Sequence, residues 1–220
     1  MEKRTFVFGD IHGCYLTFRA LFEQCKIEEQ DPIYLLGDYI DRGLSAKQTL
    51  DYIFNLIENG YKIHALRGNH EQMLLDSLKS SEIDSIWRYS NGGNFTLASF
   101  GVHSPAQIPE KYIEWINSFP FYYELEKFVM VHAGLNFHRD NPFEDTEAML
   151  WTRDRYYDKS KLDKRIIIGH TPTPLNIIKD SLNQNIIFLD GGCVYHNNPK
   201  LGNLCALELS EMKLFSQEYI

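Results

Sequence analysis

The chain has 220 residues, of which 44% are hydrophobic and 24% are charged, and this composition predicts one globular domain over residues 1–220. Its formal net charge of -8 argues against broad binding to nucleic acid or to an anionic membrane surface, because both need a dense patch of lysine and arginine. No apolar run is long enough to cross a bilayer, and the four cysteines are too few to staple a domain of this size. A strand-like run begins at Thr5, before any signal-peptide core could fit, so we expect a cytoplasmic protein.

Apolar runs rich in β-branched residues predict seven strands. Several of these runs are apolar at every position, as strands buried on both faces are. Residues with helical spacing lie between the first three runs, from Leu16 to Cys25 and from Leu50 to Ile57. Strands that alternate with helices indicate βαβ units, so the sequence predicts an α/β fold. The predicted strands cover residues 5–10, 33–38, 63–69, 128–134, 166–170, 186–192 and 204–209.

Two longer segments depart from this alternation. Residues 72–125 have a mostly helical pattern that is interrupted by NGGN at 91–94 and by three prolines, which predicts a helical insertion that walls one side of a site. Residues 136–164 are rich in Asp, Arg and Tyr and predict a long loop with a short helix. Long loops in compact domains tend to carry function, which directs attention to Trp151–Arg155.

Polar side chains that can bind metals follow five of the predicted strands, whereas the runs ending near Asp190 and Leu209 break this pattern. Because ligands of α/β sheets bind beyond the carboxyl ends of the strands, we expect the five sets to converge. Oxygen donors mixed with imidazoles favour Mn, Fe or Zn over Ca or a structural zinc. Six candidate ligands suit two ions that share a carboxylate, an arrangement used for in-line displacement at phosphorus. The polar residues after the five strands are Asp10 and His12, Asp38 and Asp41, Asn69 and His70, His132, and His170. The six candidate ligands among them are Asp10, His12, Asp38, Asn69, His132 and His170.

Three blocks, GDIHG (9–13), GDYIDRG (37–43) and GNHE (68–71), resemble the signature blocks of the phosphoprotein phosphatase group of calcineurin-like metallophosphoesterases. The segments HAG (132–134) and GHT (169–171) resemble the two later histidine blocks of that family. The resemblance implies the family's fold, a central β-sandwich of mixed sheets flanked by helices. It also implies two divalent metal ions bridged by a hydroxide that attacks phosphorus. By resemblance, Asp10 and His12 bind one ion, Asp38 bridges both, and Asn69, His132 and His170 bind the second.

The resemblance further implies that His70 is the general acid, held by Asp41, and that Arg42 and a second arginine bind the substrate phosphate. A nearby imidazolium can protonate a departing alkoxide, and a carboxylate partner favours the charged form of the histidine. The guanidinium of Arg42 has a planar fork suited to a phosphate. For the second arginine, LWTRDR (150–155) offers Arg153 and Arg155, and we favour Arg153 because it is nearer the tryptophan.

The sequence leaves three alternatives for the substrate. Glu71 in GNHE, the compact length and IIIGHTPTP (166–174) are more similar to small bacterial serine/threonine protein phosphatases, so we expect a metal-dependent phosphomonoester hydrolase that acts on phosphoproteins. GDIHGCY is also typical of symmetrical diadenosine tetraphosphate hydrolases, and several bacterial members hydrolyse many phosphoesters. We expect Mn, with Fe or Zn as alternatives, and no obligate regulatory subunit. A non-catalytic binding protein is disfavoured because no ligand is missing. Tyr195 and His196 resemble the family's last loop and are further candidates to line the cleft.

Overall fold

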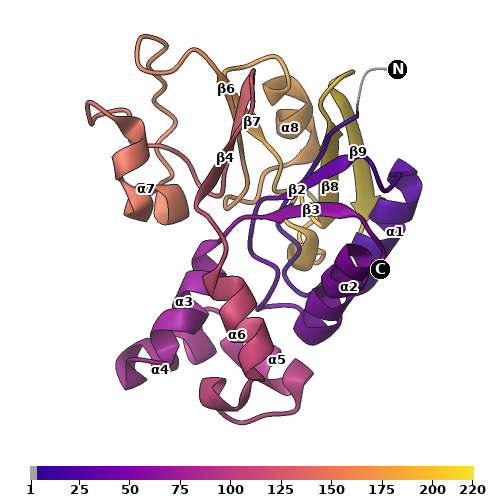
Figure 1. Ribbon diagram of the computed structural model, residues 1–220, viewed down its shortest axis with the longest axis vertical. Coiled ribbons are helices and arrows are strands. Elements are labelled where there is room, and N and C mark those ends of the chain that lie inside the picture. Colours follow the sequence, from indigo (N-terminus) through magenta and orange to yellow (C-terminus); the bar gives the residue numbers. More distant parts are fainter. Residues whose placement is uncertain (1–3) are drawn as a thin grey trace.

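The computed structural model describes residues 4–220, which fold into two β-sheets with helices around them (Figure 1). The first sheet contains β1 (Phe6–Phe8), β2 (Pro32–Leu35), β3 (Lys62–Ala65), β8 (Asn203–Glu208) and β9 (Lys213–Glu218). The second sheet contains β4 (Tyr122–Glu124), β5 (Phe128–Val131), β6 (Arg165–Ile168) and β7 (Ile186–Phe188). Their orders are β3-β2-β1-β8-β9 and β4-β5-β6-β7.

Both sheets are mixed, which confirms the expected fold class. Strands β1, β2 and β3 are parallel, and β8 and β9 join them in antiparallel pairs. Strands β5, β6 and β7 are parallel, and β4 pairs antiparallel with β5. Each sheet therefore contributes three parallel strands whose carboxyl ends point the same way within that sheet.

The apolar runs are buried on both faces, which explains why they show no alternation of polar and apolar residues. In β1, Val7 packs between the two sheets with Met130 of β5, while Phe8 packs on the other face. That other face is covered by α1 (Tyr15–Cys25) and α2 (Ala46–Glu58). In β6, Ile167 lies between the sheets, and Ile168 packs on the outer side against Met149 of α7 (Thr146–Trp151).

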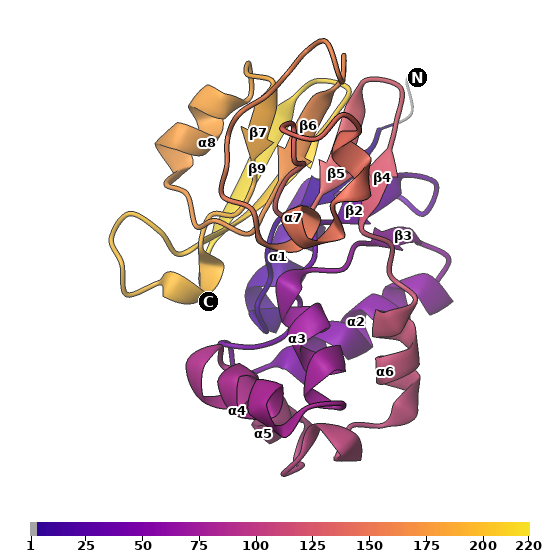
Figure 2. The ribbon, with the colours of Figure 1, turned by 90° about the vertical axis from the view of Figure 1, so that its left-hand side faces the viewer.

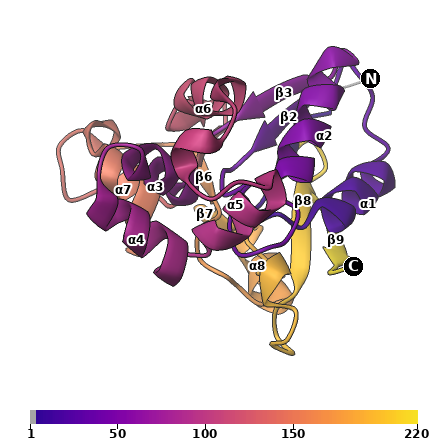
Figure 3. The same cartoon turned by 90° about the horizontal axis from the view of Figure 1, so that it is seen from below.

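Four helices form a group beyond one end of the sheets, as Figure 2 shows at the bottom of the view. They are α3 (Asn69–Ser77), α4 (Ser81–Ser90), α5 (Gly93–Phe100) and α6 (Glu110–Asn117). Figure 3, seen from below, shows the same helices in front of the strands. The remaining helix, α8 (Leu175–Ser181), connects β6 to β7. Within residues 4–220, no helix is both long enough and apolar enough to cross a membrane.

Two strands differ from the expectation. The predicted helical segment of residues 72–125 extends too far, because its helices end at Asn117 and β4 joins the second sheet. Strand β9 has no counterpart among the predicted strands. Both are edge strands of mixed polarity, YYE and KLFSQE, and they lack the continuous apolar run that marks a strand buried on both faces. The expected long loop at 136–164 does contain a short helix, α7.

Candidate metal centre

The predicted site residues follow the carboxyl ends of parallel strands from both sheets, and the structure gathers them. Three pairs of candidates follow β1, β2 and β3 of the first sheet, and one histidine follows each of β5 and β6 of the second. All eight side chains are buried, with 7% or less of each residue exposed. They are Asp10, His12, Asp38, Asp41, Asn69, His70, His132 and His170.

Asp38 lies at the centre of two groups of potential metal ligands. One group combines Asp38 with His12 and His70, and the other combines it with His132 and His170; within each group the ligand atoms lie within 4.8 Å of one another. Oδ2 of Asp38 is 3.5 Å from Nε2 of His12, and Oδ1 is 3.5 Å from Nε2 of His132. A single carboxylate therefore faces both groups with different oxygen atoms.

Two imidazole rings are oriented by backbone carbonyl groups. Nδ1 of His12 lies 2.9 Å from the carbonyl oxygen of Ile40, and Nδ1 of His132 lies 2.9 Å from that of Leu36. Because a carbonyl oxygen can only accept, Nδ1 carries the proton and donates, which leaves a lone pair on Nε2 of each ring directed into the site. Burial lowers the pKa of both imidazoles, so both rings are neutral, as metal binding requires.

Asn69 and His170 complete the second group. Oδ1 of Asn69 is 2.9 Å from Nε2 of His132 and 2.9 Å from Nδ1 of His170. Since Nε2 of neutral His132 carries no proton, two acceptor atoms face each other there, which is favourable when a shared cation lies against both. Burial lowers the pKa of His170 to about 3, so this ring is also neutral.

Three buried polar atoms in the site have no hydrogen-bond partner within residues 4–220, namely Oδ1 of Asp10, Nε2 of His70 and Nε2 of His170. Buried polar atoms are normally paired, because an unpaired one costs about 1–3 kcal/mol. The other oxygen of Asp10 accepts a hydrogen bond of 2.9 Å from the backbone N–H of His170. Unpaired carboxylate and imidazole atoms, together with the facing acceptors of Asn69 and His132, form a donor set that fits divalent cations such as Mn, Fe or Zn.

The carboxylates concentrate negative charge in the site. Burial, with the charges of Asp190 and Asp38, raises the pKa of Asp10 well above its usual range. Burial also acts to raise the pKa of Asp38, but the neighbouring His132, His70 and His12 outweigh it and lower that pKa. Bound cations would neutralise this buried charge.

Asp190 lies close enough to this cluster for its charge to raise the pKa of Asp10, but it belongs to neither group of potential metal ligands, so the expectation about its strand end stays a prediction. It follows β7, the third parallel strand of the second sheet, and only 3% of the residue is exposed. Its carboxylate accepts a hydrogen bond of 2.8 Å from the backbone N–H of Gly192, and burial raises its pKa to about 7. In the sequence, Asp190 lies between an apolar strand and Gly191. The strand before Asp38 is also followed by a glycine and an aspartate, but there the glycine comes first.

Several site residues have left-handed backbone conformations, although none is a glycine. Their φ angles are positive, at 46° for His12, 54° for Asp38, 68° for Asp41, 66° for Arg42 and 65° for His170. Such conformations are uncommon for residues with a β-carbon, and they concentrate at functional sites where surrounding structure enforces them.

Close approaches between chain segments explain two of the glycines in the sequence blocks. A β-carbon at Gly68 would overlap the Asp38 carboxylate, and one at Gly169 would overlap Oδ1 of Asp10. These positions therefore admit no larger residue without displacing a candidate ligand.

His70 has a different partner from the other site histidines. Its Nδ1 lies 2.7 Å from Oδ2 of Asp41, a carboxylate, whereas His12 and His132 use carbonyl oxygens. Nε2 of His70 has no partner and is 4.0 Å from Oδ2 of Asp38. The ring therefore faces the ligand atoms while a buried carboxylate holds its far side, an arrangement that can hold and donate a proton.

Three arginines contact residues of the site, lie beside them or act on them through their charge. Nη1 of Arg42 is 2.7 Å from Nε2 of His12 and donates to it. Arg155 is half-buried and donates a hydrogen bond of 3.0 Å to the hydroxyl of Thr171. Arg153 is exposed, yet its charge reaches His170 and helps to lower the pKa of that ring after burial and His132.

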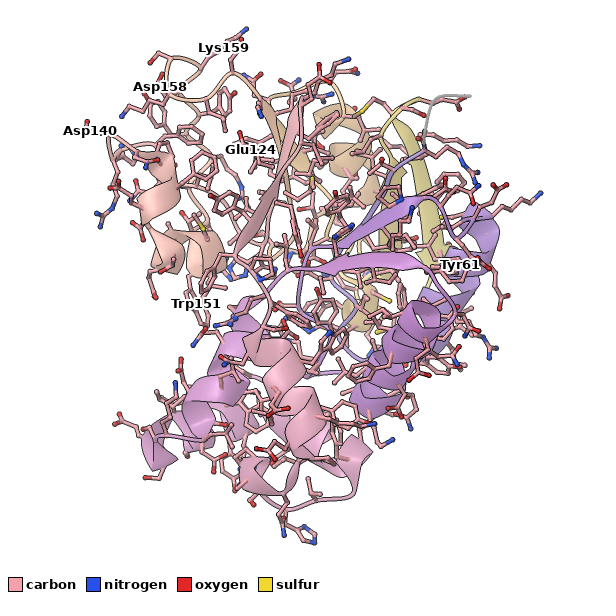
Figure 4. All side chains as sticks on the ribbon, in the orientation of Figure 1. Tyr61, Glu124, Asp140, Trp151, Asp158 and Lys159 are labelled. Carbon is pink, nitrogen blue, oxygen red and sulfur yellow. The ribbon has the colours of Figure 1, made fainter. Side chains whose placement is uncertain are left out.

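Two aromatic residues contact residues of the site. Trp151, labelled at the end of α7 in Figure 4, packs edge-on with its ring 6.2 Å from that of His170. The ring of Tyr195 lies 5.6 Å from the guanidinium of Arg42, and the role of Tyr195 in lining a cleft stays a prediction. His196 instead stacks on Tyr219 at 4.0 Å.

Known proteins share sequence and fold with this chain. Residues 3–208 match the calcineurin-like phosphoesterase family. The chain is 30% identical over 206 residues to serine/threonine-protein phosphatase 1 of Salmonella typhimurium, covering 88% of each chain. It is 31% identical over 128 residues to a symmetrical bis(5'-nucleosyl)-tetraphosphatase of Burkholderia thailandensis, covering 58% of this chain and 41% of that protein. A protein serine/threonine phosphatase from Saccharomyces cerevisiae has the same fold, with a TM-score of 0.66 at 14% identity, covering 100% of this chain and 81% of that one.

The chain therefore belongs to the calcineurin-like phosphoesterase family and is a metallophosphoesterase, a hydrolase of phosphoesters. The family uses a dinuclear centre of divalent metals, and the Asp and His groups described above could bind metal. Relatives are named both as serine/threonine phosphatases and as symmetrical tetraphosphatases, so family membership defines the chemistry and leaves the particular phosphoester to be identified.

Proposed function

We propose that the protein is a serine/threonine protein phosphatase, a metal-dependent phosphomonoester hydrolase with His70 as its general acid. The observation that carries this proposal is the contact of 2.7 Å between Nδ1 of His70 and Asp41, combined with an Nε2 atom of His70 that has no partner and faces the ligand atoms. A proton on Nε2 would be available to a leaving group at the centre of the site.

The candidate ligands divide between two cations. Asp10 and His12 would hold one, Asn69, His132 and His170 would hold the other, and Asp38 would contact both. We propose Mn, with Fe and Zn as alternatives that the same donor types accept. When bound, the two cations supply positive charge that acidifies water and neutralises the oxygens of the phosphate.

The protein's own residues would perform the remaining tasks. Arg42 and Arg153 bind the non-bridging phosphate oxygens, with the planar fork of Arg42 suited to two parallel hydrogen bonds. They orient the phosphorus so that a water oxygen, which gives up one proton to the solvent, bonds to it opposite the ester oxygen, whose bond to phosphorus breaks. His70 then donates the proton on Nε2 to the departing alkoxide, and Asp41 keeps the ring in the required orientation and stabilises its positive charge.

The choice of phosphoprotein over dinucleotide is supported by the extent of the sequence similarity. The Salmonella phosphatase matches over 88% of both chains, whereas the Burkholderia tetraphosphatase matches over 41% of its own length. The second candidate is a symmetrical diadenosine tetraphosphate hydrolase, which the 31% identity over the matched part favours. A broad-specificity phosphoesterase is the third alternative.

The catalytic part of the proposal is tested with phenyl phosphate and added Mn. We expect kcat of His70→Asn to fall by about 10²- to 10⁴-fold, the usual scale for loss of a general acid, with the bound metal unchanged. Metal content is measured by elemental analysis of the same samples. If the unaltered protein shows no turnover above His70→Asn, the proposed catalytic role of this pair is wrong.

The substrate is tested by side-by-side kinetics on a phosphoserine peptide and on diadenosine tetraphosphate. We expect the larger kcat/KM on the phosphopeptide. A large preference for the dinucleotide would replace the first candidate by the second, and comparable values on both would favour the broad-specificity alternative.

A further inference from the structure

Two side chains from the helical segment donate hydrogen bonds to the carboxylate of Asp41. The indole N–H of Trp87 in α4 donates to Oδ2 over 2.7 Å, and the hydroxyl of Thr96 in α5 donates to Oδ1 over 2.6 Å. The same hydroxyl accepts a hydrogen bond of 2.9 Å from the backbone N–H of Asp41. With His70, three side chains therefore fix both oxygens of one carboxylate.

These contacts lie in a fully buried environment. None of Asp41, His70, Trp87 and Thr96 has any exposed surface. A buried charge depends strongly on its hydrogen bonds, because no water can replace a donor that is lost. Two neutral donors on Asp41 therefore stabilise its negative charge and set the direction from which it faces the imidazole.

The turn between α4 and α5 places the indole of Trp87 and the hydroxyl of Thr96 close to Asp41. A β-carbon at Gly93 would overlap the indole of Trp87, so only glycine lets the first turn of α5 lie against that ring. Gly92 has a φ of 87°, and its carbonyl oxygen accepts a hydrogen bond of 3.3 Å from the backbone N–H of Arg42. The glycine pair within NGGN therefore brings the helical segment against the loop that carries Asp41 and Arg42.

We propose that Trp87 and Thr96 are positioning residues for the His70–Asp41 pair, and this inference rests on the proposed role of His70 as general acid. The donors of Trp87 and Thr96 orient the Asp41 carboxylate, which in turn keeps the proton on Nδ1 of His70 and directs Nε2 toward the leaving group. Helices α4 and α5 are then part of the catalytic apparatus as well as a wall beside it.

The test compares two substrates that differ in their need for a proton. Phenyl phosphate releases a weakly acidic phenol and depends on the general acid, whereas 2,4-dinitrophenyl phosphate releases a stable anion and does not. Trp87→Phe keeps an aromatic ring and removes the donor, and Thr96→Val keeps the shape and removes the hydroxyl. In each variant we expect kcat on phenyl phosphate to fall about 10- to 100-fold, and kcat on 2,4-dinitrophenyl phosphate to fall less than about threefold.

Two further variants separate positioning from packing. Thr96→Ser retains the hydroxyl and is expected to restore most of the kcat on phenyl phosphate that Thr96→Val loses. Leu97→Ala removes a buried side chain of the same helix that takes no part in these hydrogen bonds, so it lowers Tm without changing the ratio of the two kcat values. If Trp87→Phe does not fold, the Thr96→Val and Thr96→Ser pair decides the matter.

The outcome is interpreted against His70→Asn measured on the same two substrates. If His70→Asn shows the selective loss on phenyl phosphate and neither Trp87→Phe nor Thr96→Val does, this inference is overturned and the proposed function stands. An equal fall on both substrates in these two variants also overturns it, because it indicates general damage. If His70→Asn itself shows no selective loss, the role of His70 as general acid is wrong.

Discussion

Glu71 accepts a hydrogen bond from the backbone N–H of Asp38, with Oε2 at 2.8 Å from that nitrogen. The same carboxylate also accepts from the backbone N–H groups of Gly68 at 3.0 Å and Tyr39 at 2.9 Å, and the residue has no exposed surface. Glu71 therefore braces the loop that carries Asp38 and does not face a substrate. This glutamate of the GNHE block, whose resemblance favoured a protein phosphatase, therefore fixes the position of the loop backbone.

Replacing Glu71 with Gln should test that structural role. The amide nitrogen of glutamine cannot accept, so at least one buried backbone N–H loses its partner, and we expect the free energy of unfolding to fall by about 2–3 kcal/mol. Urea unfolding measures this change. The ratio of kcat/KM on phosphoserine peptide to that on diadenosine tetraphosphate should stay the same, and a shift in that ratio would show that Glu71 selects the substrate.

The two arginines of the 136–164 loop make a matched comparison. Arg155 is held by other side chains, because it donates a hydrogen bond to Thr171 and its guanidinium lies 5.0 Å from the ring of Phe188. Arg153, in contrast, is exposed. We expect Arg153→Lys to lower kcat/KM by about 10-fold or more with little change in Tm, because lysine cannot form two parallel hydrogen bonds to phosphate. Arg155→Lys should lower Tm with the smaller effect on kcat/KM. The opposite result would assign the second phosphate-binding role to Arg155.

Metal stoichiometry should distinguish Asp38 from its neighbours. Asp38 faces both groups of ligand atoms, whereas His12 and His132 each belong to one group. Elemental analysis after dialysis should therefore find both metals depleted in Asp38→Ala, and one metal largely retained in His12→Ala and in His132→Ala. Full occupancy in Asp38→Ala would exclude a shared carboxylate.

Neutral His170 should contribute stability to the metal-free protein that is lost as the pH falls below about 6.5. The folded-state pKa of His170 is about 3, below its ordinary value of 6.5, because burial disfavours the charged ring. Between these two pH values the unfolded chain binds more protons, so the free energy of unfolding decreases on acidification, by up to about 1.4 kcal/mol per pH unit for one such group. His12 and His132, whose pKa values are also lowered, act in the same direction. Asp10 and Asp190, whose pKa values are raised, act in the opposite direction, so the contribution of His170 is isolated by comparison with a variant that lacks it.

Urea unfolding of chelator-treated protein at several pH values measures this dependence. His170→Asn removes one of the titrating groups and should show a shallower decrease between pH 6.5 and about 3. Identical slopes for the two proteins would contradict the assignment of this dependence to His170.

The sequence predicted the strands that are buried on both faces, because an unbroken apolar run carries its own signal. It also identified the polar residues after β1, β2, β3, β5 and β6, because parallel strands present their carboxyl ends together. Their convergence is now observed, while their individual roles stay predictions. Edge strands β4 and β9 were missed because half-exposed strands have mixed polarity.

Other features of the site have no local signal. Trp87 and Thr96 contact Asp41 from 46 and 55 residues further along the chain, and a tryptophan in an amphipathic helix is indistinguishable in sequence from an ordinary core residue. Likewise, the left-handed backbone conformations of Asp38 and Asp41 cannot be predicted from their residue types, because tertiary contacts impose them.

The meeting of the two sheets at the candidate metal centre has a mechanical consequence. Asp38 extends from the first sheet, and His132 and His170 extend from the second, yet their ligand atoms lie within 4.8 Å of one another. A cation held by all three would cross-link the sheets at the open end of the sandwich, much as a disulfide links distant segments. Separating the sheets would then require breaking coordination bonds as well as exposing the apolar layer between them, so ions bound at the candidate metal centre would also stabilise the fold.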